Sequence, residues 1–380
     1  CYTYGQFSIR GRILSESPAP KPAAPTFESG ARAMNEALQT KGVEAYFADA
    51  SDPLHKAFIA KAAVHSGPGG RPLIGEEAEK AIDSHYDTPR SGRSLAYIHV
   101  PFCETRCLYC MFYQNPWKEE ATTEYAKQLV KELELWSDRA AQNAAPINAL
   151  YFGGGTPTAF SPDDIRLVMG AVKKYLPLAN DCEITLEGRI HNFSDAKMDA
   201  AIESGVNRFS LGVQTFNTQI RQSVMRVDDR DTIIRRLDKL CSYNNASVVC
   251  DMIYGFPGQT MEVWEDDLKT AASLHLDGVD CYQLNVFEKS PLARYIANGK
   301  LPRAATSDEK ADFFAKSVEY FTSQNWRRLS NNHWGRTIRE RNIYNAWGKS
   351  ACDCLAFGCG AGGRLAGYSY MMERKLADYY

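Results

Sequence analysis

The chain has 380 residues, of which 44% are hydrophobic and 24% charged, and its formal net charge at pH 7 is −2. This is the profile of an ordinary globular protein with a large core; it gives no reason to expect nucleic acid or a membrane surface as a partner, and no apolar run reaches transmembrane length. The 11 cysteines are an odd, scattered set, which favours a reducing, cytoplasmic location over a disulfide framework.

The first 93 residues precede any regular pattern. Residues 1–30 are rich in Pro, Ala and Ser and lack the features of a secretory signal, so we expect a disordered leader. Residues 31–93 are expected to form a helical extension, broken by the Gly- and Pro-containing stretch at 66–70.

From residue 94 onward, short runs rich in β-formers alternate with amphipathic runs of ten or more residues. The predicted strands are 95–100, 149–152, 182–186, 208–213, 247–253 and 279–286. The predicted helices between them are 124–136, 163–175, 195–204, 231–243 and 262–274. Six βα units in a row predict an α/β fold with a parallel sheet. Periodicity alone allows either an incomplete barrel or a flat, doubly wound sheet.

Three cysteines, Cys103, Cys107 and Cys110, follow the first predicted strand with the spacing C-x3-C-x2-C. Cysteine thiolates are the usual ligands of iron–sulfur clusters. Three of them on one loop can bind three irons of a cubane and leave the fourth open to a substrate or cofactor. A zinc site is the alternative, but paired C-x2-C units or nearby histidines would be typical of it. The spacing therefore favours a 4Fe-4S cluster.

Polar residues and glycines stand at the ends of the other predicted strands, except that Asp251 lies within the fifth strand and Asn285 near the end of the sixth. In strand order they are Gly154, Gly155 and Thr156, then Glu187, Gln214, Asp251 and Asn285. In parallel α/β folds, the chemistry gathers at the carboxyl ends of the strands. We therefore expect these residues to converge with the cysteine loop at one mouth.

With these motifs in order, the chain resembles the radical S-adenosylmethionine (SAM) enzymes, and among them the coproporphyrinogen-dehydrogenase-like (HemN/HemW-like) group. Four runs carry the resemblance, namely YIHVPFC (97–103), YFGGGTPT (151–158), LGVQTF (211–216) and DMIYGFPGQT (251–260). The resemblance implies a partial (β/α)6 TIM-like barrel at 94–290 and a small C-terminal α+β region at 291–380 that covers the substrate. Relatives generally continue beyond the point where this chain stops, so we expect a terminal segment to be missing.

The resemblance also implies cofactor contacts, but it leaves the catalytic residues unassigned. Cys103, Cys107 and Cys110 would bind the cluster, whose open iron is chelated by the methionine part of SAM. The implied SAM-contacting residues are Tyr97, Tyr109, Gly154, Gly155, Thr156, Glu187, Gln214, Arg226, Asp251 and Asn285. Gly154 and Gly155 would let the backbone approach the SAM ammonium, and the guanidinium of Arg226 suits a carboxylate.

Three branches of the group compete. The decarboxylase of coproporphyrinogen usually has a further Cys two residues past the third ligand. The haem chaperones typically have Asp-Phe directly after the third Cys. In this chain Met111-Phe112-Tyr113 follows Cys110. The anaerobic haem-degrading branch (the ChuW/HutW type) is more similar, through the runs CLYCMFYQN (107–115), LEGR (186–189) and DPLHKAF (52–58). Met111 departs from this branch too, where Gly is more usual.

The haem-degrading branch implies an anaerobilin synthase-like activity, in which haem is opened and methylated without oxygen to a linear tetrapyrrole and free iron. It implies a low-potential electron donor (a flavodoxin, a ferredoxin or a flavoprotein), and it allows a haem-handling partner protein. Candidate haem contacts are Arg189, His191, His333, Arg336 and Tyr344, around a wide apolar slot. Two alternatives stay open, a coproporphyrinogen III dehydrogenase-like enzyme and a haem-binding chaperone or carrier with a SAM cluster.

Overall fold

The computed structural model describes residues 51–56, 71–350 and 352–380. The expected disordered leader and much of the expected helical extension lie outside the described residues. Within the described part of the extension, α2 (Pro53–Lys56) and α3 (Glu76–Tyr86) are helical.

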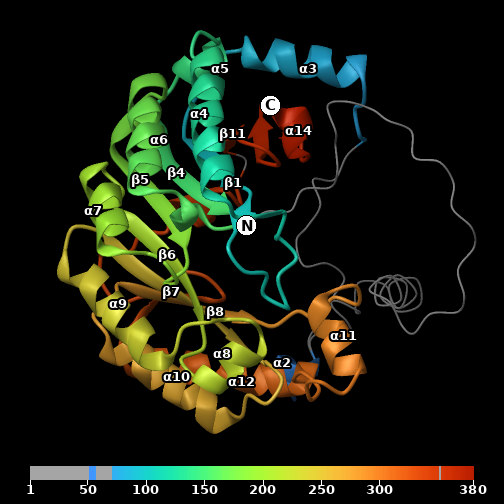
Figure 1. Cartoon of the computed structure of the whole chain (residues 1–380), viewed down its shortest axis with the longest axis vertical. Helices are drawn as coiled ribbons and strands as arrows, with labels where there is room; N and C mark the ends of the chain where they lie inside the picture. Colours follow the sequence, from blue (N-terminus) through green and yellow to red (C-terminus); the bar gives the residue numbers. More distant parts are fainter. Residues whose placement is uncertain (1–50, 57–70, 351) are drawn as a thin grey trace, which may run out of the picture.

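The centre of the molecule is a curved parallel sheet. Its strands pair in the order β1 (Ser94–Val100), β4 (Ile147–Gly154), β5 (Leu178–Gly188), β6 (Arg208–Gln214), β7 (Ser247–Tyr254) and β8 (Gly278–Gln283). Between them run α4 (Glu119–Leu135), α6 (Pro162–Tyr175), α7 (Asp195–Glu203), α9 (Arg230–Ser242) and α10 (Met261–Ser273), along the outer side of the sheet (Figure 1). All six predicted strands and all five predicted helices are confirmed, with shifted ends. The helices on the outside distinguish this partial barrel from a doubly wound sheet.

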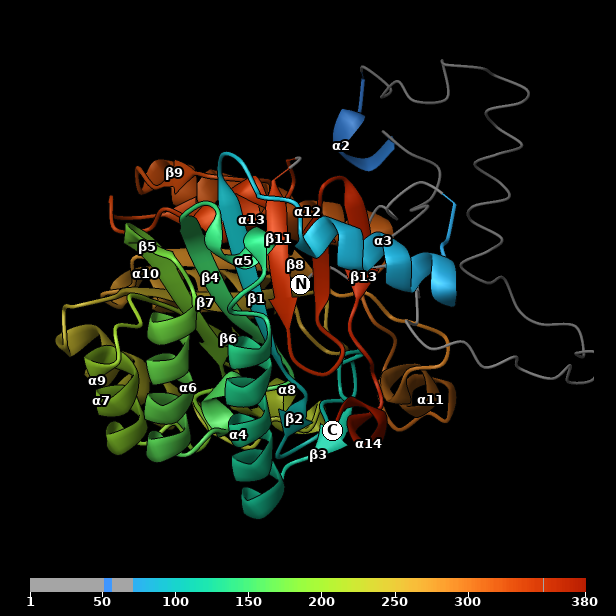
Figure 2. The ribbon, with the colours of Figure 1, turned by 90° about the horizontal axis from the view of Figure 1, so that it is seen from above.

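The residues after 290 extend the same sheet on both edges. β11 (Asp353–Phe357) pairs in parallel with β1, and β12 (Gly362–Leu365) and β13 (Tyr368–Met371) follow it antiparallel (Figure 2). At the other edge β10 (His333–Gly335) and β9 (Arg327–Arg328) continue antiparallel from β8. The C-terminal α+β region is therefore continuous with the barrel.

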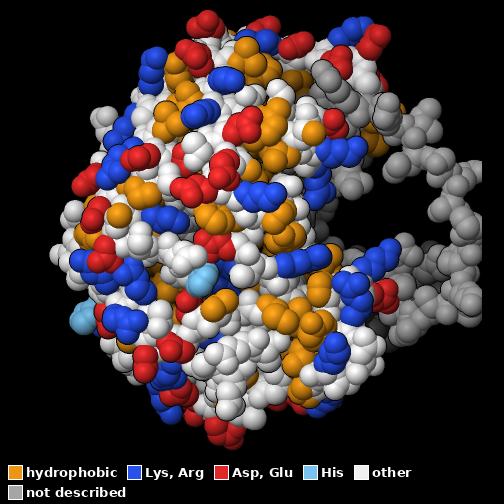
Figure 3. Space-filling model, in the orientation of Figure 1, with side chains coloured by type: hydrophobic (Ala, Val, Ile, Leu, Met, Phe, Trp, Pro, Cys, Tyr) orange, Lys and Arg blue, Asp and Glu red, His pale blue; other side chains and the backbone are white. Residues whose placement is uncertain are grey.

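Short elements and connections complete the described part of the chain. They are β2 (Phe102–Cys103), β3 (Asn115–Pro116), α5 (Ala140–Asn143), the 3-10 helix Pro157–Ala159, α8 (Thr218–Ser223), α11 (Pro291–Ala297), α12 (Ser307–Ser323), α13 (Ile343–Trp347) and α14 (Leu376–Tyr379). None of the described helices combines the length and the apolar character that crossing a membrane requires. On the face drawn in Figure 3, basic and acidic side chains are interspersed, in keeping with the small net charge.

Local sequence explains where the outer helices begin. At α6, Ser161 and Asp164 form a reciprocal capping box, while Ser194, Asp229 and Thr260 cap α7, α9 and α10 through their side-chain oxygens. Each such cap satisfies an orphan backbone N–H and is worth about 1 kcal/mol. The helices then bury their apolar faces in one core with the sheet.

A buried charge network fills the inner side of the barrel near the amino ends of the strands. Arg208 of β6 lies 3.0 Å from Glu340, measured from Nη2 to Oε1, and His333 lies between Glu340 (3.1 Å) and Asp280 (2.7 Å). Burial alone lowers the pKa of His333, but the charges of the two carboxylates and the hydrogen bonds to them outweigh burial and raise it to about 9. The positive charges of Arg208 and His333 likewise outweigh burial at Glu340 and lower its pKa to about 2.

The segment that carries Glu340 continues into α13, which closes this end of the barrel. The backbone N–H of Ile343 donates to Glu183 Oε1 at 2.8 Å. The ring of Tyr344 stacks on Tyr151 of β4, with centroids 4.5 Å apart. The chain after β10 thus crosses the amino ends of the strands.

We predict that Glu340→Gln lowers the free energy of unfolding by about 3–5 kcal/mol, because it leaves the charges of Arg208 and His333 buried without their shared partner. Urea unfolding at pH 7 measures the effect. Glu319→Gln, at an exposed position of α12 that pairs with Lys316, is the matched control and should stay near the wild type. Equal stability of the two variants would refute the structural role of the network.

Candidate cofactor site

The three predicted cluster ligands lie on the loop that follows β1. β2 pairs with β3, and the backbone N–H of Trp117 donates to the carbonyl of Cys103 at 3.0 Å, so the two ends of the loop are joined. Cys103 and Cys107 are buried, and Cys110 is half-buried. Each thiol accepts a hydrogen bond. Thr156 Oγ1 donates to Cys103 at 3.3 Å, Arg189 donates to Cys107, and the N–H of Phe112 donates to Cys110 at 3.4 Å.

The electrostatic surroundings of the three thiols differ. Burial raises the pKa of Cys103 and of Cys110, and the charges of neighbouring thiols add to this effect. Burial also acts on Cys107, but the positive charges of Arg226 and Arg189 prevail and lower its pKa. The three thiols therefore lie within electrostatic range of one another, and the guanidinium groups of Arg189 and Arg226 lie close to Cys107.

These residues fit an anionic iron–sulfur cluster. Within the described residues, no three His, Cys, Asp or Glu side chains converge on a position for one metal ion. A cubane does not require such convergence, because each thiolate binds a different iron. The buried thiols and the adjacent guanidinium groups supply the soft ligands and the positive charge that the cluster needs.

The glycine turn after β4 packs directly against the cluster loop. Gly154 has a φ of 110°, and a Cβ there would lie 2.7 Å from the ring of His99. A Cβ on Gly155 would lie 2.6 Å from the backbone oxygen of Phe102, next to Cys103. His99 itself is buried, which lowers its pKa to about 4, and its Nδ1 lies 3.0 Å from the hydroxyl of Tyr97. Neither glycine leaves room for a side chain.

The barrel brings several strand-end residues together on its inner side. Glu187 accepts a hydrogen bond from the hydroxyl of Tyr151 at 2.5 Å, and Asp251 accepts one from Ser210 at 3.1 Å. Burial, followed by the charges of Asp280 and Glu187, raises the pKa of Asp251 to about 7. Glu187 and Asp251, from β5 and β7, thus lie within electrostatic range of each other.

Four further residues of the implied SAM set lie around the same mouth. Nε and Nη2 of Arg226 donate to the hydroxyl of Tyr109, at 3.1 and 3.0 Å, and Nη1 donates to the carbonyl of Gly212. The ring of Tyr109 meets Phe256 edge-on at 5.3 Å. Gln214 ends β6 with a φ of 76°, and Asn285 follows β8. The carboxylate-binding role of Arg226 stays a prediction, because these donors contact the chain itself.

The five candidate haem contacts fall into two groups. Arg189 and His191 lie beside the cluster loop, where His191 Nδ1 is 3.0 Å from Asp228. His333 is completely buried between two carboxylates, Tyr344 stacks inside the barrel, and Arg336 donates to the carbonyl of Leu274 at 2.6 Å. These last three hold the closed end together, and their positions give no support to a role in binding haem.

Sequence reasoning missed Tyr282 of β8. It lies two residues beyond Asp280 and therefore on the same, inner face of the strand. Tyr282 is 41% exposed and lies within electrostatic range of Asp280, Asp251 and Glu187. Side chains two residues apart in a strand point to the same face. This rule, applied from Asp280 along the predicted strand, could have identified Tyr282.

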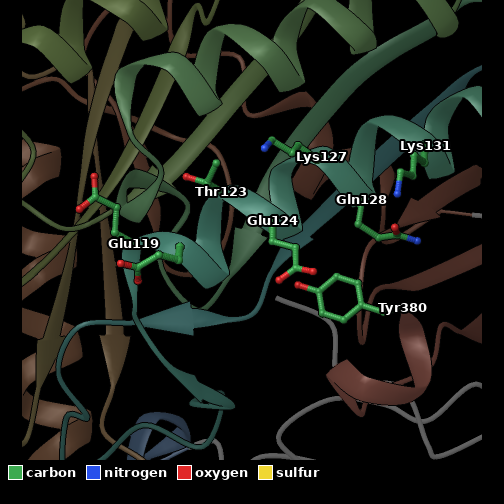
Figure 4. A pocket seen from close by; sticks show the side chains of 8 residues that line it. Glu119, Thr123, Glu124, Lys127, Gln128, Lys131 and Tyr380 are labelled. Carbon is green, nitrogen blue, oxygen red and sulfur yellow. The ribbon is translucent and has the colours of Figure 1, made fainter.

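A surface hollow on the outer face of α4 lies apart from these residues (Figure 4). Glu119, Glu124, Lys127 and Lys131 are among its lining residues, and Tyr380 borders it. None of the implied cofactor contacts lines it, so it is not part of the candidate site.

Comparisons with known proteins agree with this geometry. Residues 97–271 match the model of the Radical SAM superfamily. The chain is 42% identical over 313 residues to the anaerobilin synthase of Escherichia coli O157:H7, covering 82% of this chain and 70% of that protein.

The chain belongs to the radical SAM superfamily.

The 42% identity places this radical SAM protein on the branch of the anaerobilin synthase, and further relatives agree with its place in the HemN/HemW-like group. It is 26% identical over 274 residues to the heme chaperone HemW of Bacillus subtilis (strain 168), covering 72% of this chain and 71% of that one. It is 32% identical over 218 residues to an oxygen-independent coproporphyrinogen III oxidase of Paracoccus denitrificans, covering 57% and 48%. Coproporphyrinogen III oxidase (HemN) from Escherichia coli shares the fold, with a TM-score of 0.68, 23% identity, and coverage of 78% and 70%. The cofactors are accordingly a 4Fe-4S cluster and SAM.

We predict that Cys103→Ala, Cys107→Ala and Cys110→Ala each abolish cluster assembly, because each removes the ligand of one iron. The iron content per chain after anaerobic reconstitution measures this. Cys352→Ala, at a half-buried cysteine outside the loop, is the matched control and should load iron like the wild type. Full iron content in any of the three loop variants would rule that cysteine out as a ligand.

We also predict that Gly155→Ala destabilises the fold by about 1–3 kcal/mol, as overpacking does, and weakens SAM binding, because the turn and the cluster loop must separate. Urea unfolding and titration calorimetry with SAM measure the two effects. Gly170→Ala on α6, where a Cβ meets nothing within 4 Å, should leave SAM binding unchanged. Unaltered binding in Gly155→Ala would count against the turn as part of the SAM site.

Proposed function

We propose that this chain is a radical SAM enzyme that opens and methylates haem without oxygen, giving a linear tetrapyrrole and free iron. The observation that carries the proposal is the 42% identity to an anaerobilin synthase over 82% of the chain. The HemW and coproporphyrinogen oxidase relatives cited above are 26% and 32% identical over shorter stretches.

The residues at the mouth of the barrel suit the handling of these cofactors. When bound, the reduced cluster supplies the electron that cleaves SAM, and SAM supplies the radical and the methyl group. Cys103, Cys107 and Cys110 hold the cluster, and the glycine turn keeps side chains away from the SAM ammonium. Burial raises the pKa values of the inward-facing carboxyl groups of Glu187 and Asp251, and a cationic ligand beside them would favour their ionised forms.

The mouth also offers apolar surface for a flat tetrapyrrole. On the cluster loop, Met111 is 46% exposed and Phe112 is 36% exposed. Tyr282 and Val286, at and beyond the end of β8, are 41% and 38% exposed. Large apolar side chains left exposed near a cofactor site are typical of a binding surface for an apolar ligand.

Two other functions would use the same surface. A coproporphyrinogen III dehydrogenase-like enzyme and a haem chaperone both handle tetrapyrroles, and both kinds of relative match this chain. The enzyme that we propose needs a low-potential electron donor, such as a flavodoxin, a ferredoxin or a flavoprotein, and it allows a haem-handling protein as a further partner. The cytoplasmic location stays a prediction.

We expect the reconstituted protein, incubated anaerobically with haem, SAM and a low-potential reductant, to convert haem into a ring-opened tetrapyrrole that carries one additional methyl group. Mass spectrometry of the tetrapyrrole and a colorimetric assay of released iron measure the reaction. Parallel reactions without SAM, and with Cys107→Ala, serve as controls.

The alternatives are separated by two parallel incubations. With coproporphyrinogen in place of haem, loss of two carboxyl groups would select the decarboxylase. With haem and an acceptor protein, transfer of intact haem to the acceptor would select the chaperone. Either result, with unchanged haem in the complete reaction, would overturn the proposed function.

A further inference from the structure

The segment that follows β5 crosses to the cluster loop and holds it from one side. Nη1 of Arg189 donates to the carbonyl of Thr105 at 3.1 Å and to its hydroxyl at 2.7 Å, while Nη2 donates to the sulfur of Cys107. The planar guanidinium thereby reaches both the backbone of the loop and one of the cluster ligands. A lysine ammonium is a single point donor and could not span both in this way.

The position of Arg189 is determined by its surroundings. Its backbone N–H donates to Thr158 Oγ1 at 3.2 Å, and a Cβ on the preceding Gly188 would lie 2.2 Å from the side chain of Thr158. Three residues further on, Nδ2 of Asn192 donates to Glu104 on the cluster loop at 2.8 Å. The segment is thus attached to the barrel through Thr158 and to the loop through Glu104, and the guanidinium lies between these attachments.

Arg189 is distinct from the other groups that hydrogen-bond to the cluster cysteines. Cys103 accepts a hydrogen bond from a threonine hydroxyl and Cys110 accepts one from a backbone N–H, whereas the donor to Cys107 is the charged guanidinium of Arg189. Arg226 also acts on Cys107, but through its charge, because its own hydrogen bonds go to Tyr109 and Gly212.

We propose that Arg189 is a positioning residue of the cluster, which holds Cys107 in the loop and stabilises the reduced cluster. Reduction adds one negative charge to the cluster. A positive charge and an N–H···S hydrogen bond at a ligand sulfur favour the more negative state and therefore raise the reduction potential. An arginine keeps its charge at every accessible pH, so this effect is permanent.

The test is the midpoint potential of the cluster, measured by an EPR-monitored redox titration of the reconstituted protein without haem. In Arg189→Gln, which loses the charge, we expect the equilibrium constant for one-electron reduction to fall about tenfold, a shift of about 59 mV to more negative potential. Arg189→Lys, which keeps the charge but loses the fork, should shift in the same direction by less. Arg166→Gln is the matched control, since Arg166 pairs with Asp163 and Glu203 on the exposed side of α6, and it should keep the wild-type potential.

An iron-loaded Arg189→Gln with the potential of the wild type would overturn the proposal. If Arg189→Gln does not retain iron, Arg189→Lys decides the matter. A potential below that of the wild type supports the proposal, and an unchanged potential refutes it. Because the titration contains no haem, its result is independent of whether haem is the substrate.

Discussion

The buried pairing of Arg208 with Glu340 is the interaction on which the architecture depends. Both side chains are almost completely inaccessible to solvent, and removal of two charges from water is favourable only when each finds good partners. Glu340 finds three of them, because it also contacts His333 and accepts a hydrogen bond from Ser247. The chain after β10 carries Glu340, so it must cross the amino ends of the strands to bring this carboxylate to its buried partners. One end of the barrel is thereby covered, and the residues predicted to bind the cofactors lie toward the other end.

The groups at the carboxyl ends of the strands differ in charge. The guanidinium groups of Arg189 and Arg226 lie near the thiol of Cys107 and lower its pKa against the effect of burial. Burial raises the pKa values of Glu187 and Asp251, which face the inside of the barrel from β5 and β7. The two guanidinium groups therefore suit an anionic cluster, whereas the two carboxyl groups ionise most readily beside a cation.

Much of this arrangement could be predicted from the sequence, because its signals are local. Period-two and period-3.6 patterns identified the strands and helices, and parallel strands send their carboxyl ends to one edge, which brought Glu187 and Asp251 together. The closed end was not predictable in this way. His333, Arg336 and Tyr344 carry groups that are common in ligand sites, and only long-range packing shows that their partners are other parts of the chain. The contact between Arg189 and Cys107 could not be predicted either, because the two residues lie far apart in the sequence and no sequence pattern links them.

The pairing of β11 with β1 has a consequence for biosynthesis. Asp353–Phe357 complete the edge of the strand from which the cysteine loop emerges, and the turn after them donates from the N–H of Cys359 to Tyr125, whose hydroxyl in turn donates to the carbonyl of His99. During translation, β1 thus remains an open edge until more than two hundred further residues have left the ribosome. The strand that carries the cysteine loop therefore gains its second neighbour only after Asp353–Phe357 have been made.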